Sequence, residues 1–324
     1  MGRLYRLFAA IATVATLTAP TVAKAEDVLK LALPHKGLWD TGIADYGQRM
    51  GFYEQEGLKL DLLYTAGGSE TEQAVMSGTA DLGLADGLLG VLAAFGKGVP
   101  LTIVSAEITG SPDLFWYVRA DSPIKSLKDA GGKTMGFSSP GSSTNLVALL
   151  LVQQAGTPIK LTPTGDFSGT LTQVMSGQID IGYAGVPFAF DQIDAGKIRI
   201  VARGSDVPEI ADQTVRVNFV LADTVKNKRD QLVRFMRAYQ RTVDWLYSGD
   251  PKAVQWLADD AQVTVDEAAR VPTEFFPKTA LRIAPVDGLD LTIKQAIETK
   301  RLSGPLTKEQ IANLMDIVYT PPQN

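Results

Sequence analysis

The chain has 324 residues, no cysteine, a single histidine and a formal net charge of −5. Without cysteine it can form no disulfide, thiolate metal site or thiol nucleophile, and one histidine excludes a metal cage built from several imidazoles. The acidic balance offers no basic patch to phosphates, so we expect no nucleic-acid partner, and the length favours two domains over one.

The first residues have the three parts of a secretory signal peptide. Arg3 and Arg6 precede an apolar run over residues 7–17, and small residues at 23–25 stand at the spacing of a cleavage site. The apolar run is shorter than the roughly 20 residues that span a bilayer. We therefore predict a signal peptide over residues 1–25 and a periplasmic mature protein.

Strand and helix patterns alternate after this segment. In chain order the pattern predicts a strand at 28–33, a helix at 41–56 capped by Thr41, a strand at 58–64, a helix at 70–77 and a strand at 81–85. Gly57 and Gly78 stand where the two helices should end. This order is typical of a parallel sheet covered by helices.

The same order recurs further along the chain. It runs through a strand at 133–137, a helix at 145–155, a strand at 159–164, a helix ending at 176 and a strand at 179–183. Residues 75–78 (Val-Met-Ser-Gly) recur as 174–177, at an offset of 99 positions. At the same offset, Asp81, Gly83 and Ala85 recur as Asp180, Gly182 and Ala184. Glycines that end helices explain only part of this match, so we predict two lobes of like topology.

Two extended apolar segments, at residues 115–119 and 215–221, are expected to cross between the lobes. Helical patterns follow at 229–247, 251–261, 287–300 and 307–319, and we expect this tail to pack on the first lobe. The predicted fold class is therefore α/β, with two parallel-sheet lobes joined by two crossing strands. The first lobe would comprise residues 26–118 and 217–324, and the second lobe residues 119–216.

In open parallel sheets, ligands bind beyond the carboxyl ends of the strands. The loops in that position are residues 35–40, 67–71, 86–89, 138–145 and 185–188. The loop at 138–144 carries five hydroxyls before a helix, and hydroxyls with free backbone N–H groups suit an oxyanion. Plain N-capping, which needs one hydroxyl, is the alternative. No arginine stands in these loops to hold an anion.

Three other residues of these loops are candidates for ligand contact. Trp39 could cover the flat part of a ligand and His35 could donate a hydrogen bond, but each could equally be structural. Asp86 could receive a ligand amine, or it could cap the helix that follows. Both readings stay open for each residue.

Several short motifs resemble one protein family. They are residues 51–58 (Gly-Phe-Tyr-Glu-Gln-Glu-Gly-Leu), 67–69, 77–81, 97–100, 126–129 and 138–144. In this order, over most of the mature chain, they are similar to the periplasmic proteins that bind nitrate, taurine, sulfonates or thiamine pyrimidine precursors for ABC transporters. The resemblance implies the type II periplasmic-binding-protein fold and delivery of a solute to an ABC transporter permease.

The resemblance also implies which residues touch the ligand. They are His35, Trp39, Gly68, Ser69, Asp86, Ser139, Ser142, Ser143 and Thr144, together with Gly185 and Pro187 in the second repeat. Many relatives have a tryptophan before that proline, where this chain has Val186. Related enzymes that make the thiamine pyrimidine or cleave a carbon–sulfur bond rely on cysteines, which this chain lacks.

The expected function is that of an exported solute-binding protein for a small anionic or zwitterionic organic molecule, similar to a sulfonate or taurine. We expect a monomer with no catalytic activity, no cofactor and no metal. A neutral heterocycle such as a thiamine pyrimidine precursor is the alternative ligand. A periplasmic receptor, or an exported enzyme using His35 with Asp40 or Asp86, is the alternative function.

Overall fold

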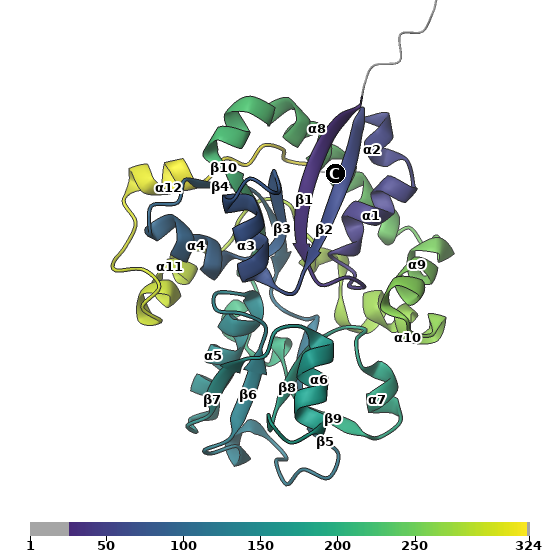
Figure 1. Cartoon of the computed structure of the whole chain (residues 1–324), viewed down its shortest axis with the longest axis vertical. Helices are drawn as coiled ribbons and strands as arrows, with labels where there is room; N and C mark the ends of the chain where they lie inside the picture. Colours follow the sequence, from purple (N-terminus) through teal and green to yellow (C-terminus); the bar gives the residue numbers. More distant parts are fainter. Residues whose placement is uncertain (1–25, 323–324) are drawn as a thin grey trace, which may run out of the picture.

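The computed structural model describes residues 26–322, which form two lobes, one above the other in Figure 1. Each lobe is built around strands of its own, and helices cover them. The predicted signal peptide, residues 1–25, lies outside the described residues. Within residues 26–322, no helix combines the length and the apolar character that crossing a bilayer would require.

The sheet of the first lobe has five strands in the order β2-β1-β3-β10-β4. They are β1 (Asp27–Pro34), β2 (Leu58–Thr65), β3 (Leu82–Gly87), β4 (Leu101–Thr109) and β10 (Thr214–Leu221). As predicted, β1 is parallel to β2 and β3, whereas β10 is antiparallel to β3 and β4. The sequence pattern does not single out β4, because a strand buried along its whole length shows no clean alternation.

Helices α1 (Gly42–Arg49), α2 (Phe52–Gln55), α3 (Gly68–Met76) and α4 (Leu88–Gly96) belong to the first lobe. The single helix expected over 41–56 is divided, because Gly51 adopts a left-handed backbone with φ of +72°. Thr41 stands at the N-cap position of α1, as expected, but its side chain makes no capping hydrogen bond. Its Oγ1 donates instead to the carbonyl oxygen of His35 at 2.7 Å, which ties the start of α1 to the loop after β1.

The second lobe contains β5 (Leu114–Arg119), β6 (Thr134–Phe137), β7 (Lys160–Pro163), β8 (Gly182–Gly185) and β9 (Ile198–Arg203). Strands β8-β5-β9 form one ladder and β6-β7 another, and a parallel bridge between Met135 and Ile181 joins them. Helices α5 (Ser143–Ala155), α6 (Phe167–Met175) and α7 (Phe190–Asp194) complete this lobe.

The two segments expected to cross between the lobes are strands, but each lies within a single sheet. β5 pairs only with β8 and β9 of the second lobe, and β10 pairs with β3 and β4 of the first. The chain therefore crosses through the short stretches 110–113 and 204–213. Sequence periodicity locates strands but cannot say which neighbour they pair with, and this is why the expectation differs from the structure.

The tail contains α8 (Ala222–Leu246), α9 (Pro251–Ala261), α10 (Val265–Arg270), a π-helical turn (Val271–Phe275), α11 (Leu289–Glu298) and α12 (Lys308–Leu314). Most of it packs on the first lobe, as expected, with α8 against α1 and α2 and α11 against α4. The stretch around α10 also reaches the second lobe. Arg270 lies 3.4 Å from Asp194, and the rings of Phe275 and Phe190 are 5.4 Å apart.

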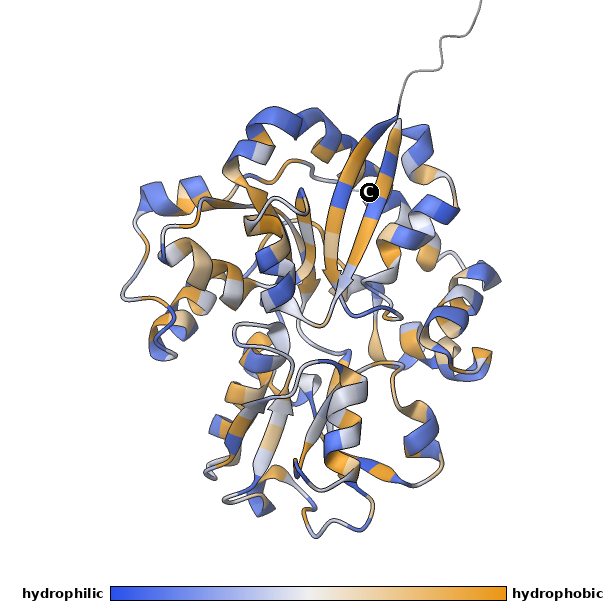
Figure 2. Cartoon of the chain, in the orientation of Figure 1, coloured by the Kyte–Doolittle hydropathy of each residue, from blue (hydrophilic) through white to orange (hydrophobic). Residues whose placement is uncertain are grey.

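The repeat found in the sequence corresponds to a repeated local structure in the two lobes. Thr65 and Thr71 share a hydroxyl hydrogen bond of 2.7 Å, and Thr164 and Thr170, 99 positions later, share one of the same length. Both lobes bury apolar side chains, and β1 and β2 alternate between orange and blue residues in Figure 2. The same backbone frame thus occurs twice, facing a common boundary.

Candidate functional site

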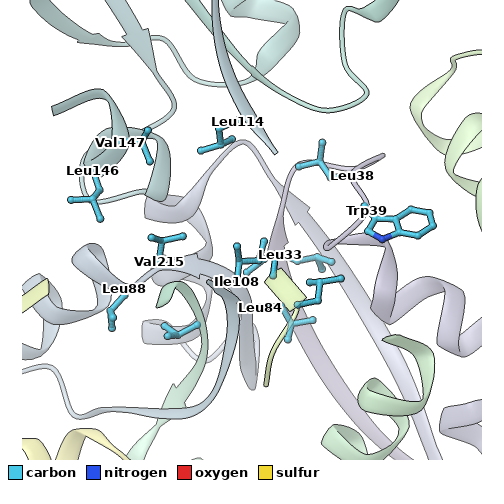
Figure 3. Close-up of a cluster of buried hydrophobic side chains, with 14 of the residues drawn as sticks. Leu33, Leu38, Trp39, Leu84, Leu88, Ile108, Leu114, Leu146, Val147 and Val215 are labelled. Atoms are coloured by element: carbon cyan, nitrogen blue, oxygen red, sulfur yellow. The ribbon is translucent and has the colours of Figure 1, made fainter. Parts of the chain in front are cut away.

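A small cavity of about 30 Å³ lies where the loops of the two lobes meet. The residues around it come from both lobes: Pro34, His35, Leu38, Asp40, Thr41, Gly68, Ala85, Gly87, Leu114, Ser138, Ser142, Ser143, Thr144, Phe167 and Arg216. Leu38 of the first lobe and Leu114, which opens β5 of the second lobe, lie above the buried side chains of Leu33 and Leu84 (Figure 3). The site therefore stands at the carboxyl ends of the strands of the first lobe, as predicted.

Arg216, on β10, is the central charged residue of the site. Its side chain is 6% exposed, with Nη1 2.9 Å from Asp40 Oδ2 and Nη2 2.8 Å from Asp113 Oδ2. Its Nε donates to Ser143 Oγ of the second lobe at 2.9 Å. Burial alone would lower the pKa of Arg216, but Asp113 and Asp40 raise it above its ordinary value. The predicted loops contain no arginine, as the sequence shows, but β10 brings Arg216 to the site from outside them.

Carboxyl groups outnumber this guanidinium. Besides Asp40 and Asp113, the buried residues Asp86 and Glu107 stand near the site, and Glu107 accepts a hydrogen bond of 2.7 Å from Tyr239. Burial, as the largest cause, raises the pKa of Asp40 and raises those of Asp86 and Glu107 well above the usual range. The first lobe therefore presents more carboxyl groups than Arg216 can pair, and burial favours the protonated form of Asp86 and Glu107.

Asp86 lies directly under the start of α3. Its Oδ1 accepts a hydrogen bond from the backbone N–H of Gly87 at 2.7 Å, while its Oδ2 has no partner among the described residues. A Cβ atom on Gly68 would clash with Oδ1, so only glycine allows the loop to pass this close. Asp86 thus serves the backbone before α4, and one of its oxygens is left over.

His35 and Phe167 form an aromatic pair across the lobe boundary. Their rings are stacked with centroids 4.3 Å apart and planes 24° apart. Burial first, and Arg216 second, lower the pKa of His35 from 6.5 to about 4, so the imidazole is neutral at neutral pH. His35 also adopts a left-handed backbone (φ +51°), as does Ala85 (φ +55°), the residue before Asp86. Such strain in non-glycine residues concentrates at functional sites.

The hydroxyls of residues 138–144 bond mainly to the protein. Ser142 caps α5 by accepting from the N–H of Asn145 at 3.1 Å, and Thr144 bonds to the hydroxyls of Ser138 and Ser142. Ser139 Oγ accepts from the N–H of Ser69 of the first lobe at 3.2 Å. The capping alternative thus holds for Ser142, while Ser139 and Ser143 connect the lobes.

The remaining predicted contacts do not line the cavity. The indole of Trp39 is buried, donates to Tyr247 at 3.0 Å and points away from the cluster in Figure 3. Ser69, Asp86, Ser139, Gly185 and Pro187 also lie outside its wall. Gly185 nevertheless supports the site, because its Cα faces Phe167 and a Cβ there would be 3.2 Å from the ring.

The sequence analysis missed Arg216, Asp113 and Phe167. Arg216 lies in the middle of an otherwise mainly apolar strand, β10, and a buried charge in such a strand is a signal that could have been weighed. Phe167 opens α6 at the position that Gly68 holds in α3, which the offset of 99 could have shown. Nothing in the local pattern marks Asp113.

Solved structures share this architecture. The periplasmic aliphatic sulphonate binding protein SsuA from Escherichia coli is 17% identical, with a TM-score of 0.70 over 92% of this chain and 94% of that one. The periplasmic nitrate-binding protein NrtA from Synechocystis PCC 6803 is 13% identical, with a TM-score of 0.71 over 90% and 86%. The ligand binding component of an ABC-type import system from Staphylococcus aureus is 13% identical, with a TM-score of 0.67 over 90% and 97%. The fold is that of a periplasmic binding protein.

Sequence comparison identifies the family. The family described as "NMT1/THI5 like" matches residues 44–253, more than half of the chain, and the chain belongs to it. A curated relative, 4-amino-5-hydroxymethyl-2-methylpyrimidine phosphate synthase from Legionella pneumophila, is 32% identical over 90 residues. That match spans 28% of this chain and 28% of the synthase.

Proposed function

We propose that this chain is an exported, monomeric solute-binding protein that captures a small amine-bearing organic molecule between its lobes in the periplasm and delivers it to an ABC importer. The observation that carries the proposal is the unpartnered carboxyl oxygen of Asp86 beside a site already rich in acid groups. A carboxylate accepts hydrogen bonds, so its natural partner in a ligand is an amine or another N–H donor.

The charge of the site argues against a simple anion. The guanidinium of Arg216 is held by Asp40, Asp113 and Ser143, so it has little capacity left for a nitrate or a plain sulfonate. A plain anion would also lose its hydration in a poorly solvated site that offers it no free cation in exchange. A zwitterion of the taurine kind would offset this loss through its amine, with its acid group at the start of α5.

The aromatic pair favours an amino-substituted heterocycle as the second candidate. His35 and Phe167 stack across the boundary at 4.3 Å, a spacing that a flat ring inserted between them would open. The short match to a pyrimidine phosphate synthase points in the same direction. A thiamine pyrimidine precursor would place its ring there and its amino group toward Asp86.

Binding of either candidate requires the lobes to separate first. Both are larger than a cavity of about 30 Å³, so the contacts between Ser69 and Ser139 and between His35 and Phe167 must give way. A ligand that then touches both lobes stabilises the closed form by its differential affinity for it. Only a closed, loaded form would then be passed on to the importer.

Binding assays on the mature protein test this proposal. Taurine and 4-amino-5-hydroxymethyl-2-methylpyrimidine are compared with ethanesulfonate, which is taurine without its amine, and with nitrate, by thermal shift and calorimetry. We expect an amine-bearing ligand to bind, and Asp86→Asn to weaken it at least tenfold, which is about 1.4 kcal/mol. Asp61→Asn, at an exposed site on β2, is the matched control and should leave the affinity unchanged.

Two results would overturn the proposal. Binding of ethanesulfonate or nitrate as tight as that of the amine-bearing ligands would show that the amine is not recognised. An unchanged affinity in Asp86→Asn would show that recognition lies elsewhere. Because Asp86 is a desolvated acid, its amide variant should melt no lower than the parent, which separates lost binding from lost folding.

We also propose that the chain is not an enzyme. The imidazole of His35 is stacked on Phe167 and has a pKa of about 4, so it is a weak base at neutral pH. The sequence provides no cysteine nucleophile. Mass spectrometry of the bound ligand after long incubation should recover it unchanged, and any turnover that His35→Ala abolishes would contradict this proposal.

A further inference from the structure

A second and larger cavity lies at the hinge between the lobes. It has a volume of about 430 Å³, within the range of small-molecule sites, and shares no lining residue with the cleft described above. Its walls come from the two crossings, 110–113 and 204–213, and from the stretch 277–282, where the tail returns from the second lobe to the first. We call this cavity the hinge pocket.

The hinge pocket has an apolar wall. Its apolar lining residues are Pro112, Val207, Ile210, Ala211, Pro277 and Ala280. A neighbouring recess shares Pro112, Ser205 and Pro277 with it and extends toward Arg203 and Phe275. An elongated apolar group would therefore find continuous contact along the hinge.

Polar groups without partners accompany this wall. Ser111 and Thr109, both more than nine-tenths buried, have hydroxyls with no hydrogen-bond partner in the described part of the chain, and the same holds for Nε of Arg282. Buried polar groups are normally satisfied, and these three atoms are enclosed beside the pocket without a protein partner within the described chain. All three belong to residues that line the hinge pocket.

The cationic groups favour an acid as that partner. Arg203 lies over the ring of Phe275 at 4.9 Å and has no carboxylate within ion-pair distance among residues 26–322. Arg282 is paired with Asp287 through Nη2 at 2.9 Å, and its side chain is 39% exposed, so part of the guanidinium remains open to a ligand. Of the acids on the walls, Glu274 is bonded to Arg270, and Asp212 is exposed.

We propose that the hinge pocket binds a small amphipathic carboxylate, with its apolar chain along Pro112, Val207 and Pro277 and its carboxylate near Arg282. Since the three wall segments connect the lobes, their relative positions change when the lobes rotate. A ligand held there has different contacts in the open and closed forms, so it shifts the equilibrium between them. The proposal does not depend on which solute the cleft takes.

Octanoate is the probe for this site, in calorimetric titrations of the mature protein, with octan-1-ol as the uncharged comparison. Ala211→Phe fills the pocket from an exposed position in its wall, and Ala120→Phe, exposed at the end of β5 and outside the pocket, is the matched control. We expect one saturable octanoate site per chain. Ala211→Phe should lower its affinity at least tenfold, Ala120→Phe should not change it, and octan-1-ol should bind at least tenfold more weakly.

The proposal fails on any of three results. Absence of saturable octanoate binding would remove the site. Equal affinity in Ala211→Phe and the parent would place the octanoate elsewhere on the chain. Octan-1-ol binding as tightly as octanoate would show that the arginines do not recognise the carboxylate. Thermal melting of both phenylalanine variants confirms that each is folded. A loss of octanoate binding in Ala211→Phe alone therefore reports on the pocket.

Discussion

The two lobes place opposite side chains at equivalent corners of the cleft. In the first lobe, Gly68 opens α3 and leaves room for Asp86; in the second, 99 positions later, Phe167 opens α6 and fills the space that Gly185 leaves. The backbone frame is the same, as the paired threonine bonds show. Each lobe thus has one glycine and one large side chain at these two positions, but in the opposite arrangement. The first lobe can therefore present an acid to a ligand, and the second lobe an aromatic ring.

The two corners also have opposite effects on the stability of the fold. The corner of the first lobe buries a carboxyl group whose pKa is raised by desolvation, so it costs stability at neutral pH. The corner of the second lobe buries a ring, which contributes stability through the hydrophobic effect. Three predictions test this contrast, from the largest expected effect to the smallest.

Phe167→Ala should give the largest loss of stability. The ring is buried and touches His35, Tyr183 and Phe188, so its removal should cost about 3–5 kcal/mol in free energy of unfolding. Phe188→Ala, at a half-buried ring next to it, should cost clearly less. Urea unfolding measures both, and equal losses would show that Phe167 has no special place in the lobe boundary.

His35 should make stability depend on pH. Its pKa is about 4 in the folded protein and 6.5 ordinarily, so the folded state holds this proton more weakly than the unfolded chain does. The stability that the neutral imidazole of His35 contributes is fully present above pH 6.5 and is lost as the pH falls toward 4. Relative to His35→Gln, the parent should therefore lose about 3 kcal/mol between pH 7.5 and pH 4.

Denaturant unfolding of the two proteins across this pH range is the measurement. The variant keeps all buried carboxyl groups, so their titration cancels in the difference. A difference that stays constant with pH would mean that His35 is solvated or carries its charge in the folded state. It would also remove the argument that His35 is a weak base.

Gly68→Ala and Gly185→Ala should lose different amounts of stability, although both replace a buried glycine. A Cβ on Gly68 clashes with Asp86, and we expect a loss of about 1–3 kcal/mol, the usual range for overpacking. A Cβ on Gly185 comes only to 3.2 Å from Phe167, so the loss should be under about 1 kcal/mol. Thermal melting measures both losses. A larger loss in Gly185→Ala than in Gly68→Ala would contradict the proposed difference between the two corners.

Adding Asp86→Asn does not relieve the clash at Gly68, since the amide has the same shape as the acid. Adding Asp86→Ala to Gly68→Ala should recover most of the lost stability, because it removes the atom that clashes. Failure of this double variant to recover would locate the strain in the loop backbone.

The sequence by itself determined the α/β class, the parallel order of β1, β2 and β3, the repeat at an offset of 99 and the loops that form the cleft. These features depend on periodicity, on helix-ending glycines and on the direction of strands, all of which are local. The resemblance in short motifs carried the family, which the match over residues 44–253 confirms.

Only the tertiary structure decided which side chains share the cleft and the hinge. Arg216 meets Asp40 and Asp113 across more than a hundred positions of sequence, and Trp39, next to Asp40, turns to Tyr247 instead. Strand pairing and burial set these neighbours, and neither is encoded in a local pattern. The amine that we propose beside Asp86 also rests on such neighbours, because the charge balance of a site depends on every group that folding brings to it.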